Sequence, residues 1–161
     1  DLGVIASFTP AWHGNVGDHN VQAAIGDRAG SQMRAQPMIA DDAVFTFSSD
    51  ITTAHGWRND AANPYHGMQI GHNRQPVEGG PDARYAKPRS ERIRLDTLVD
   101  GYTINGAYQL GRSQELGSIE VGKQADLVIL NQNLFDVNRY DVHKTKPVAV
   151  IMDGELVFGE L

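Results

Sequence analysis

The sequence predicts an α/β fold in which parallel strands come first and an antiparallel β segment comes last. Two short apolar runs, residues 2–8 and 44–48, have the length and the partly β-branched content of buried strands. Helical material lies between them, so the two runs form a βαβ unit and favour a parallel sheet or barrel. Beyond residue 111 the pattern changes from helical to β spacing, and Asp153-Gly154 is a hairpin turn signal.

The helical material between the two strands is weakly patterned. Residues 18–33 place Val21, Ala24 and Ile25 on one face, although two glycines interrupt the segment. Residues 37–42 begin with a proline, which the first turn of a helix tolerates. We therefore expect two short helices here, the second leading directly into the strand at 44–48.

A long loop is predicted at about residues 51–91, because this segment has little periodicity and many glycines and prolines. Loops of this length are usually functional or disordered. The segment also contains aromatic side chains, a methionine and three histidines with which it can pack. We therefore expect an ordered lid or substrate loop in preference to a linker.

The last part of the chain combines one clear helix with antiparallel strands. Residues 95–110 follow helical spacing, and Gly111 stands where a C-terminal cap is expected. Residues 125–130 and 148–152 read as strands, and 156–158 as the return strand of the hairpin.

The overall composition narrows the possible classes of function. The chain has 161 residues, 40% of them hydrophobic and 21% charged, with a net charge of −6. This acidity argues against a nucleic-acid surface, and no apolar run is long enough to cross a membrane. With no cysteine, disulfides and Cys-ligated zinc are excluded, whereas six histidines and 20 acidic residues allow a His/carboxylate metal site. The compartment, cytoplasmic or exported, stays open. A core strand directly after Asp1 predicts that the native polypeptide extends upstream.

Asp50 is the principal catalytic candidate, because it follows the second strand at its C-terminal end. That edge of a parallel sheet carries the active site in α/β folds. A carboxylate there can accept a proton from a metal-bound water or bind the metal itself. The alternative is that Asp50 caps a turn through a local hydrogen bond.

Four further residues are candidates for substrate binding. His13 comes shortly after the first strand, and His55 and Trp57 follow Asp50 closely. Arg74 could pair with a substrate carboxylate, since the guanidinium fork fits that group. Equally, it could pair with a loop acid such as Glu78 and hold the loop shut. No two histidines have the spacing of a zinc-binding motif, so the sequence pattern itself marks no metal ligands.

Several segments together resemble the C-terminal end of the metal-dependent amidohydrolase superfamily, in its family-3 branch, which includes N-substituted formamide deformylases. They are LGVIASFTP at 2–10, VFTFSSD at 44–50, TINGAYQLG at 103–111, GSIEVGKQADLVIL at 117–130 and VAVIMDGELVF at 148–158.

The resemblance implies a fold, a metal and a reaction. Residues 1–112 would hold the last two strands of a (β/α)₈ TIM-like barrel, and residues 113–161 part of a small β-sandwich domain. Asp50 would be the proton-transferring base, or a ligand, beside a divalent metal, typically zinc, whose other ligands lie upstream. The substrate would be a small amide, formamide, imide or cyclic urea.

These implications leave more than one role open for the chain itself. We expect the isolated chain to be inactive and the intact protein to be a hydrolase. A truncated regulatory or binding homologue, similar to proteins named as exoenzyme regulators, is the alternative. We expect no nucleic-acid or membrane partner, and either a homo-oligomer or pairing with the missing N-terminal part.

Overall fold

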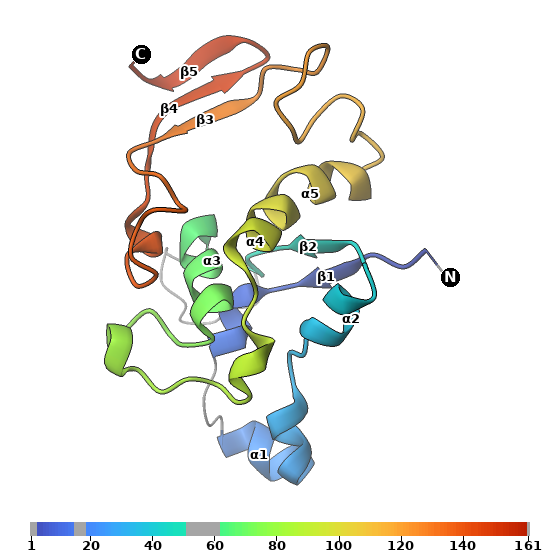
Figure 1. Cartoon of the computed structure of the whole chain (residues 1–161), viewed down its shortest axis with the longest axis vertical. Coiled ribbons are helices and arrows are strands. Elements are labelled where there is room, and N and C mark those ends of the chain that lie inside the picture. Colours follow the sequence, from blue (N-terminus) through green and yellow to red (C-terminus); the bar gives the residue numbers. More distant parts are fainter. Residues whose placement is uncertain (1–2, 15–18, 51–61, 161) are drawn as a thin grey trace.

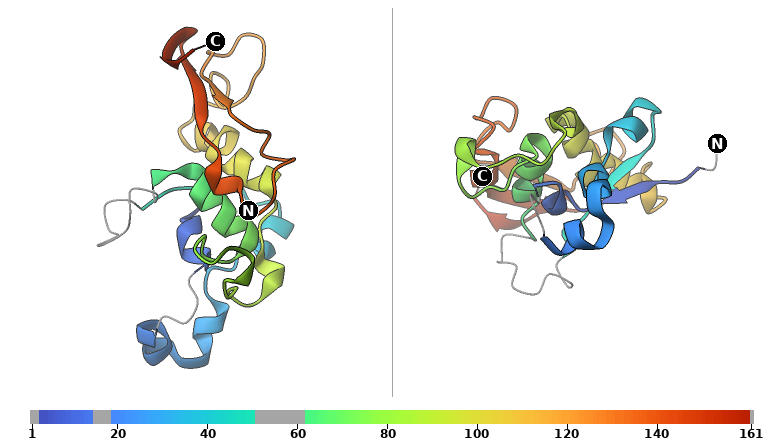
Figure 2. Two further views of the ribbon diagram at one scale, coloured as in Figure 1. Left: turned by 90° about the vertical axis from the view of Figure 1, so that its left-hand side faces the viewer. Right: turned by 90° about the horizontal axis from the view of Figure 1, so that it is seen from below.

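The computed structural model describes residues 3–14, 19–50 and 62–160 (Figure 1). A pair of parallel strands lies in the middle of the molecule, with helices packed along it. A three-stranded sheet lies at one end of the long axis, and helix α1 (His19–Ile25) lies at the opposite end, as the side view in Figure 2 also shows.

The parallel pair consists of β1 (Ala6–Phe8) and β2 (Phe45–Phe47), with Ala6 opposite Phe45 and Phe8 opposite Phe47. All three residues of β2 are buried. The connection between the strands is helical, as expected, and it comprises η1 (Pro10–Gly14), α1 (His19–Ile25), η2 (Gly26–Ser31) and α2 (Gln36–Ala40). The prediction of a parallel βαβ unit is therefore confirmed.

The prediction of a loop over 51–91 is wrong for its central part, which forms helix α3 (Pro64–Asn73). The helix has a regular start, because the Asn63 side chain accepts a hydrogen bond from the Tyr65 backbone N–H at 2.9 Å. It ends at Arg74, which has a left-handed backbone with φ of 58°. Two short 3₁₀ turns, Gly80–Asp82 and Arg89–Glu91, follow it.

Helix α3 belongs to the core and is not a lid. Gly67 and Gly71 lie one turn apart, and a Cβ at these positions would meet Tyr102 and Leu98 respectively at 3.0 Å or less. The two glycines that lower the helical propensity are therefore the residues that allow this close approach. Met68 on the same helix is 4% exposed and belongs to the main hydrophobic cluster.

The helix predicted over 95–110 is interrupted, which corrects the expectation of one continuous element. The structure has α4 (Leu95–Tyr102) and α5 (Ile104–Gln109), separated by Thr103 with φ −128° and ψ −98°. The Thr103 hydroxyl donates to the Val99 carbonyl at 2.7 Å, an interaction that competes with the regular helix pattern. Gly111 has φ of 71° and closes α5, as predicted. No helix in the described ranges is long and apolar enough to cross a membrane.

The C-terminal sheet contains β3 (Leu127–Leu130), β4 (Pro147–Met152) and β5 (Glu155–Gly159), all antiparallel. Asp153 and Gly154 both have positive φ, as the two central residues of a type I′ hairpin turn require. The predicted hairpin is therefore confirmed. Large apolar side chains on all three strands are exposed, namely Val128, Ile129, Val148, Met152, Leu156, Val157 and Phe158.

Two buried amide side chains attach α3 to the segment that precedes β4. The Gln69 Oε1 atom accepts hydrogen bonds from the His143 backbone N–H at 3.0 Å and contacts its Nδ1 at 2.8 Å. The Asn73 side chain donates to the Arg139 carbonyl at 2.8 Å and accepts from Arg139 Nε at 2.6 Å. Both amides are 1% exposed, so water does not replace these bonds.

Replacing Asn73 by Ala is expected to destabilise the chain by about 2 kcal/mol, because the Arg139 carbonyl and the Arg139 Nε–H both lose their bond to this buried amide. The measurement is the free energy of unfolding in urea. Gln109→Ala, on the exposed side of α5, is the matched control and is expected to change stability by less than about 0.5 kcal/mol. Equal effects of the two substitutions would contradict the role of Asn73.

Candidate active site

Asp50 lies just beyond β2, where the polypeptide leaves the carboxyl end of the parallel pair. Its backbone is left-handed, with φ of 52°, so the chain turns sharply at this residue. The Trp12 indole Nε1–H donates to Asp50 Oδ2 at 3.3 Å. Trp12 belongs to η1, which follows β1 directly. The segments after the two parallel strands therefore meet at the edge where the sequence predicts the site.

His13, next to Trp12 in the chain, is 1% exposed and packs edge-on against Phe8 with ring centroids 5.7 Å apart. Among the residues that the structure describes, neither ring nitrogen has a hydrogen-bond partner. Burial, with a smaller contribution from the charge of Arg74, lowers the pKa of His13 to about 4; Glu91 opposes this shift. The imidazole is therefore neutral at physiological pH, with one donor and one acceptor nitrogen.

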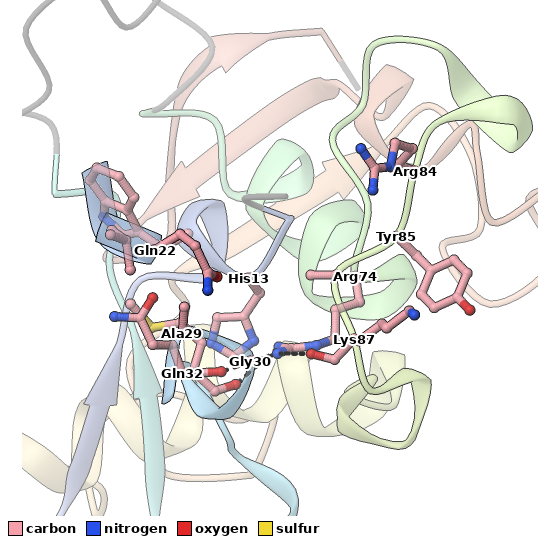
Figure 3. Close-up of a pocket in the computed structure, with 13 residues that line it drawn as sticks. His13, Gln22, Ala29, Gly30, Gln32, Arg74, Arg84, Tyr85 and Lys87 are labelled. Atoms are coloured by element: carbon pink, nitrogen blue, oxygen red, sulfur yellow. Dashed lines mark hydrogen bonds between the residues drawn. The ribbon is translucent and has the colours of Figure 1, made fainter. Parts of the chain in front are cut away.

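A pocket of about 400 Å³ opens beside His13 (Figure 3). Its walls come from η1, from α1 and the segment after it, from Arg74, and from residues 84–87. His13 and Arg74 lie next to each other in this pocket, so the structure brings together two of the predicted binding residues. Sequence reasoning did not single out Arg84 and Lys87, which also line the pocket.

Arg74 connects the end of α3 to two other segments beside this pocket, residues 32–33 and Lys87. Its guanidinium donates to the carbonyls of Met33 at 3.0 Å, Gln32 at 3.1 Å and Lys87 at 3.4 Å. The residue is 2% exposed. Arg74 therefore joins these segments through backbone carbonyls, whereas its contact with a substrate carboxylate or with a loop acid such as Glu78 remains a prediction.

Glu91 is a second buried charge near the pocket that sequence reasoning missed. Its carboxylate accepts from Arg34 Nε at 2.9 Å and from the Gln36 backbone N–H at 2.9 Å. Burial by itself raises the pKa of Glu91, but these two donors outweigh it and the pKa falls below its ordinary value. Glu91 therefore stays ionised and fixes the start of α2.

The remaining sequence candidates give a mixed result. His55 and Trp57 lie outside the described residues, so their predicted substrate contacts remain predictions. No group of three His, Cys, Asp or Glu side chains with the geometry of a metal site occurs within residues 3–14, 19–50 and 62–160. Trp12 was not among the sequence candidates, although its place directly after the first strand was a signal.

Acidification is expected to destabilise the folded chain through His13. Its pKa is about 4 when folded and 6.5 in the unfolded reference, so only the unfolded state binds the proton between these values. The stability is present above pH 6.5 and is lost as the pH falls toward 4. Between pH 7 and 5 we expect a loss of about 2 kcal/mol in the free energy of unfolding. Urea titrations should show that His13→Gln flattens this dependence; an unchanged slope would contradict the assignment.

Sequence comparison identifies relatives of this chain. A family described as "Amidohydrolase family" matches residues 1–158. Imidazolonepropionase from Parabacteroides distasonis is 45% identical over 65 residues, which are 40% of this chain and 16% of that protein. Probable imidazolonepropionases from Homo sapiens and Danio rerio are 36% and 47% identical over 69 residues, 42% of this chain and 16% of theirs. The aligned segment is thus about one sixth of each relative.

Two solved structures share the mixed α/β fold. An amidohydrolase from Thermotoga maritima superposes with a TM-score of 0.52 and 22% identity, covering 78% of this chain and 25% of that one. The crystal structure of an uncharacterized protein superposes with a TM-score of 0.60 and 17% identity, covering 98% and 36%. Because the family match extends over almost the whole sequence, this chain belongs to the amidohydrolase family.

Proposed function

We propose that this chain is the C-terminal part of a metal-dependent hydrolase that cleaves a C–N bond in a small amide, formamide, imide or cyclic urea. The observation that carries the proposal is the position of Asp50 at the carboxyl end of β2, with Trp12 holding one carboxylate oxygen. Membership of the amidohydrolase family supports the reaction class. The imidazolonepropionases named above support it further through their sequence similarity.

Asp50 acts as the proton-transferring base in this proposal. Its carboxylate accepts a proton from the attacking water while the C–O bond forms. It then gives the proton to the leaving nitrogen as the C–N bond breaks, so the residue ends the cycle ionised. The hydrogen bond from Trp12 engages Oδ2, and this restricts rotation of the carboxylate while the proton moves.

The described residues supply at most part of a metal site. Amidohydrolase family members are generally metal-dependent, and we propose zinc as the metal. The described residues contain no three-residue ligand set, so they do not by themselves fit a metal centre. Asp50 could supply one carboxylate, and the other ligands would come from residues outside the described ranges.

The same proposal assigns the two sheets to two parts of a larger protein. The β1–β2 pair would be the last two strands of a TIM-like barrel, and β3–β5 would be part of a small β-sandwich. The exposed apolar side chains of β3–β5 support pairing with further polypeptide, either the N-terminal part of the same protein or a second copy. We expect the 161-residue chain alone to be inactive.

The test is to isolate the native polypeptide that carries this sequence, measure its intact mass, and assay it against formamide, imide and cyclic urea substrates. We expect hydrolysis that is lost after chelation and restored by zinc. A native polypeptide that binds no metal and hydrolyses none of these substrates would overturn the proposal. That result would indicate a regulatory or binding homologue instead.

A further inference from the structure

The pocket beside His13 has the opposite charge to the protein as a whole. The chain carries a net charge of −6. Among the described residues that line the pocket, however, three are cationic and none is acidic. The three are Arg74, Arg84 and Lys87. The nearby acid Glu91 is already engaged by Arg34, so its charge is compensated locally.

The pocket also contains buried polar groups without a partner in the described part of the chain. Both ring nitrogens of His13 and the Nε of Arg74 are in this state, and the two residues are 1% and 2% exposed. Leaving such groups unpaired costs free energy, and structures normally provide a partner. A bound ligand with acceptor oxygens, admitted by a shift of the side chains that cover these atoms, would satisfy the Arg74 Nε–H and the one N–H of neutral His13.

A carboxylate meets these conditions better than a neutral group. It carries only acceptor oxygens, which match donors on His13 and Arg74, and its charge suits the excess of cations. Arg84 and Lys87 also line the pocket and are exposed, so they contribute long-range attraction more than fixed hydrogen bonds (Figure 3). The other walls include Trp12, Met33 and Tyr85, which can pack against a short carbon chain.

We infer that this pocket binds a carboxylate carried by the substrate, so that the protein acts on C–N bonds in molecules that also bear an acid group. The assignment of the ligand as substrate rests on the proposed function. Trp12 connects the two places, because it lines the pocket and also donates its indole N–H to Asp50. Trp12 therefore forms part of the wall between this pocket and the Asp50 carboxylate.

The experiment is an NMR titration of the ¹⁵N-labelled native polypeptide that carries this sequence with glutarate, using glutaramide as the neutral probe of the same length. The signals followed are the Trp12 indole N–H and the His13 ring. Glutarate should shift both in a saturable way, and added salt should weaken binding because it screens the cations. Glutaramide should bind at least about fivefold more weakly, as the loss of charge-assisted hydrogen bonds requires.

Two exposed cations provide the variants, since their replacement leaves the buried structure intact. The double variant Arg84→Gln/Lys87→Gln should weaken glutarate binding by about fivefold, whereas Lys146→Gln, an exposed lysine outside the pocket, should not. Equal binding of glutaramide and glutarate would overturn the inference. So would the absence of saturable shifts at Trp12 and His13, or an equal effect of Lys146→Gln.

Failure of this inference can be told apart from failure of the proposed function, because binding is measured without turnover. Saturable glutarate binding together with no hydrolysis by the native polypeptide would leave the pocket assignment standing and reject the reaction. Conversely, hydrolysis with the same kcat/KM for acid-bearing and neutral substrates would leave the reaction standing and reject the carboxylate pocket.

Discussion

Asp50→Asn is expected to lower kcat of the native polypeptide by roughly 10²- to 10⁴-fold, the usual contribution of a positioned acid–base group. Asparagine has nearly the same shape and its amide oxygen can still accept the Trp12 indole N–H, so the local fold should survive. The amide cannot accept and return a proton, so the chemical step is lost. The measurement is steady-state kinetics with a substrate that the parent protein hydrolyses.

Three readings separate catalysis by Asp50 from a structural role. The melting temperature of Asp50→Asn should stay close to that of the parent. Asp41→Asn, an exposed aspartate at the end of α2, is the matched control and should keep full activity. Retention of more than about half of the parent kcat in Asp50→Asn would show that Asp50 only caps the turn after β2.

Gly101→Ala is expected to destabilise the folded chain by about 3 kcal/mol, because helix α4 lies directly against the ring of Phe47. A Cβ at Gly101 would lie 2.2 Å from Cδ2 of Phe47 and 2.3 Å from Cε2. Phe47 is itself packed between Phe45 and Tyr102, with ring centroids 6.3 and 5.6 Å away, so it has little room to move. The measurement is the free energy of unfolding in urea.

Gly106→Ala is the matched control, made in the neighbouring helix α5. Its new Cβ would have only the Gly101 carbonyl oxygen within reach, at 3.9 Å, which is an ordinary contact. Because alanine also has the higher helix propensity, this variant should be neutral or more stable by up to about 1 kcal/mol. If both variants lost the same stability, a general defect of the Gly→Ala replacement would explain the result, and the proximity of Phe47 would not.

The strands and the hairpin could be predicted because their signals are local. The short apolar runs gave β1 and β2, and Asp153-Gly154 gave the hairpin, since few other residues accept two consecutive positive φ values. The helical crossover between β1 and β2 then made a parallel pairing the favoured arrangement.

Helix α3 was missed because its glycines are required by tertiary packing, which a local sequence pattern does not show. In the sequence, Gly67 and Gly71 lower the helical propensity, and only the nearby Leu98 and Tyr102 side chains explain their presence. The pair Asn63-Pro64 was nevertheless a readable start signal, because an N-cap residue followed by proline is a common helix beginning.

The candidate site likewise has one part that could be predicted from the sequence and one part that could not. The position of Asp50 followed from a general property of parallel sheets, which needs only the strand and its direction. The pocket depends on Arg74 meeting carbonyls of Gln32 and Met33, about forty positions earlier in the chain. Contacts over that separation follow from the packing of whole elements and leave no pattern in the local sequence.

The parallel pairing of Ala6 with Phe45 also affects the order in which the sheets form during folding. The hairpin of β4 and β5 can close within about 1–10 μs, because its strands are joined by two residues. The parallel pair forms only after the long crossover segment has brought the two strands together. The entropy of closing that segment is lost before the contacts between the strands can compensate for it. A chain that refolds from the unfolded state should therefore form its β4–β5 hairpin early. The edge that carries Asp50 should be among the last parts to form.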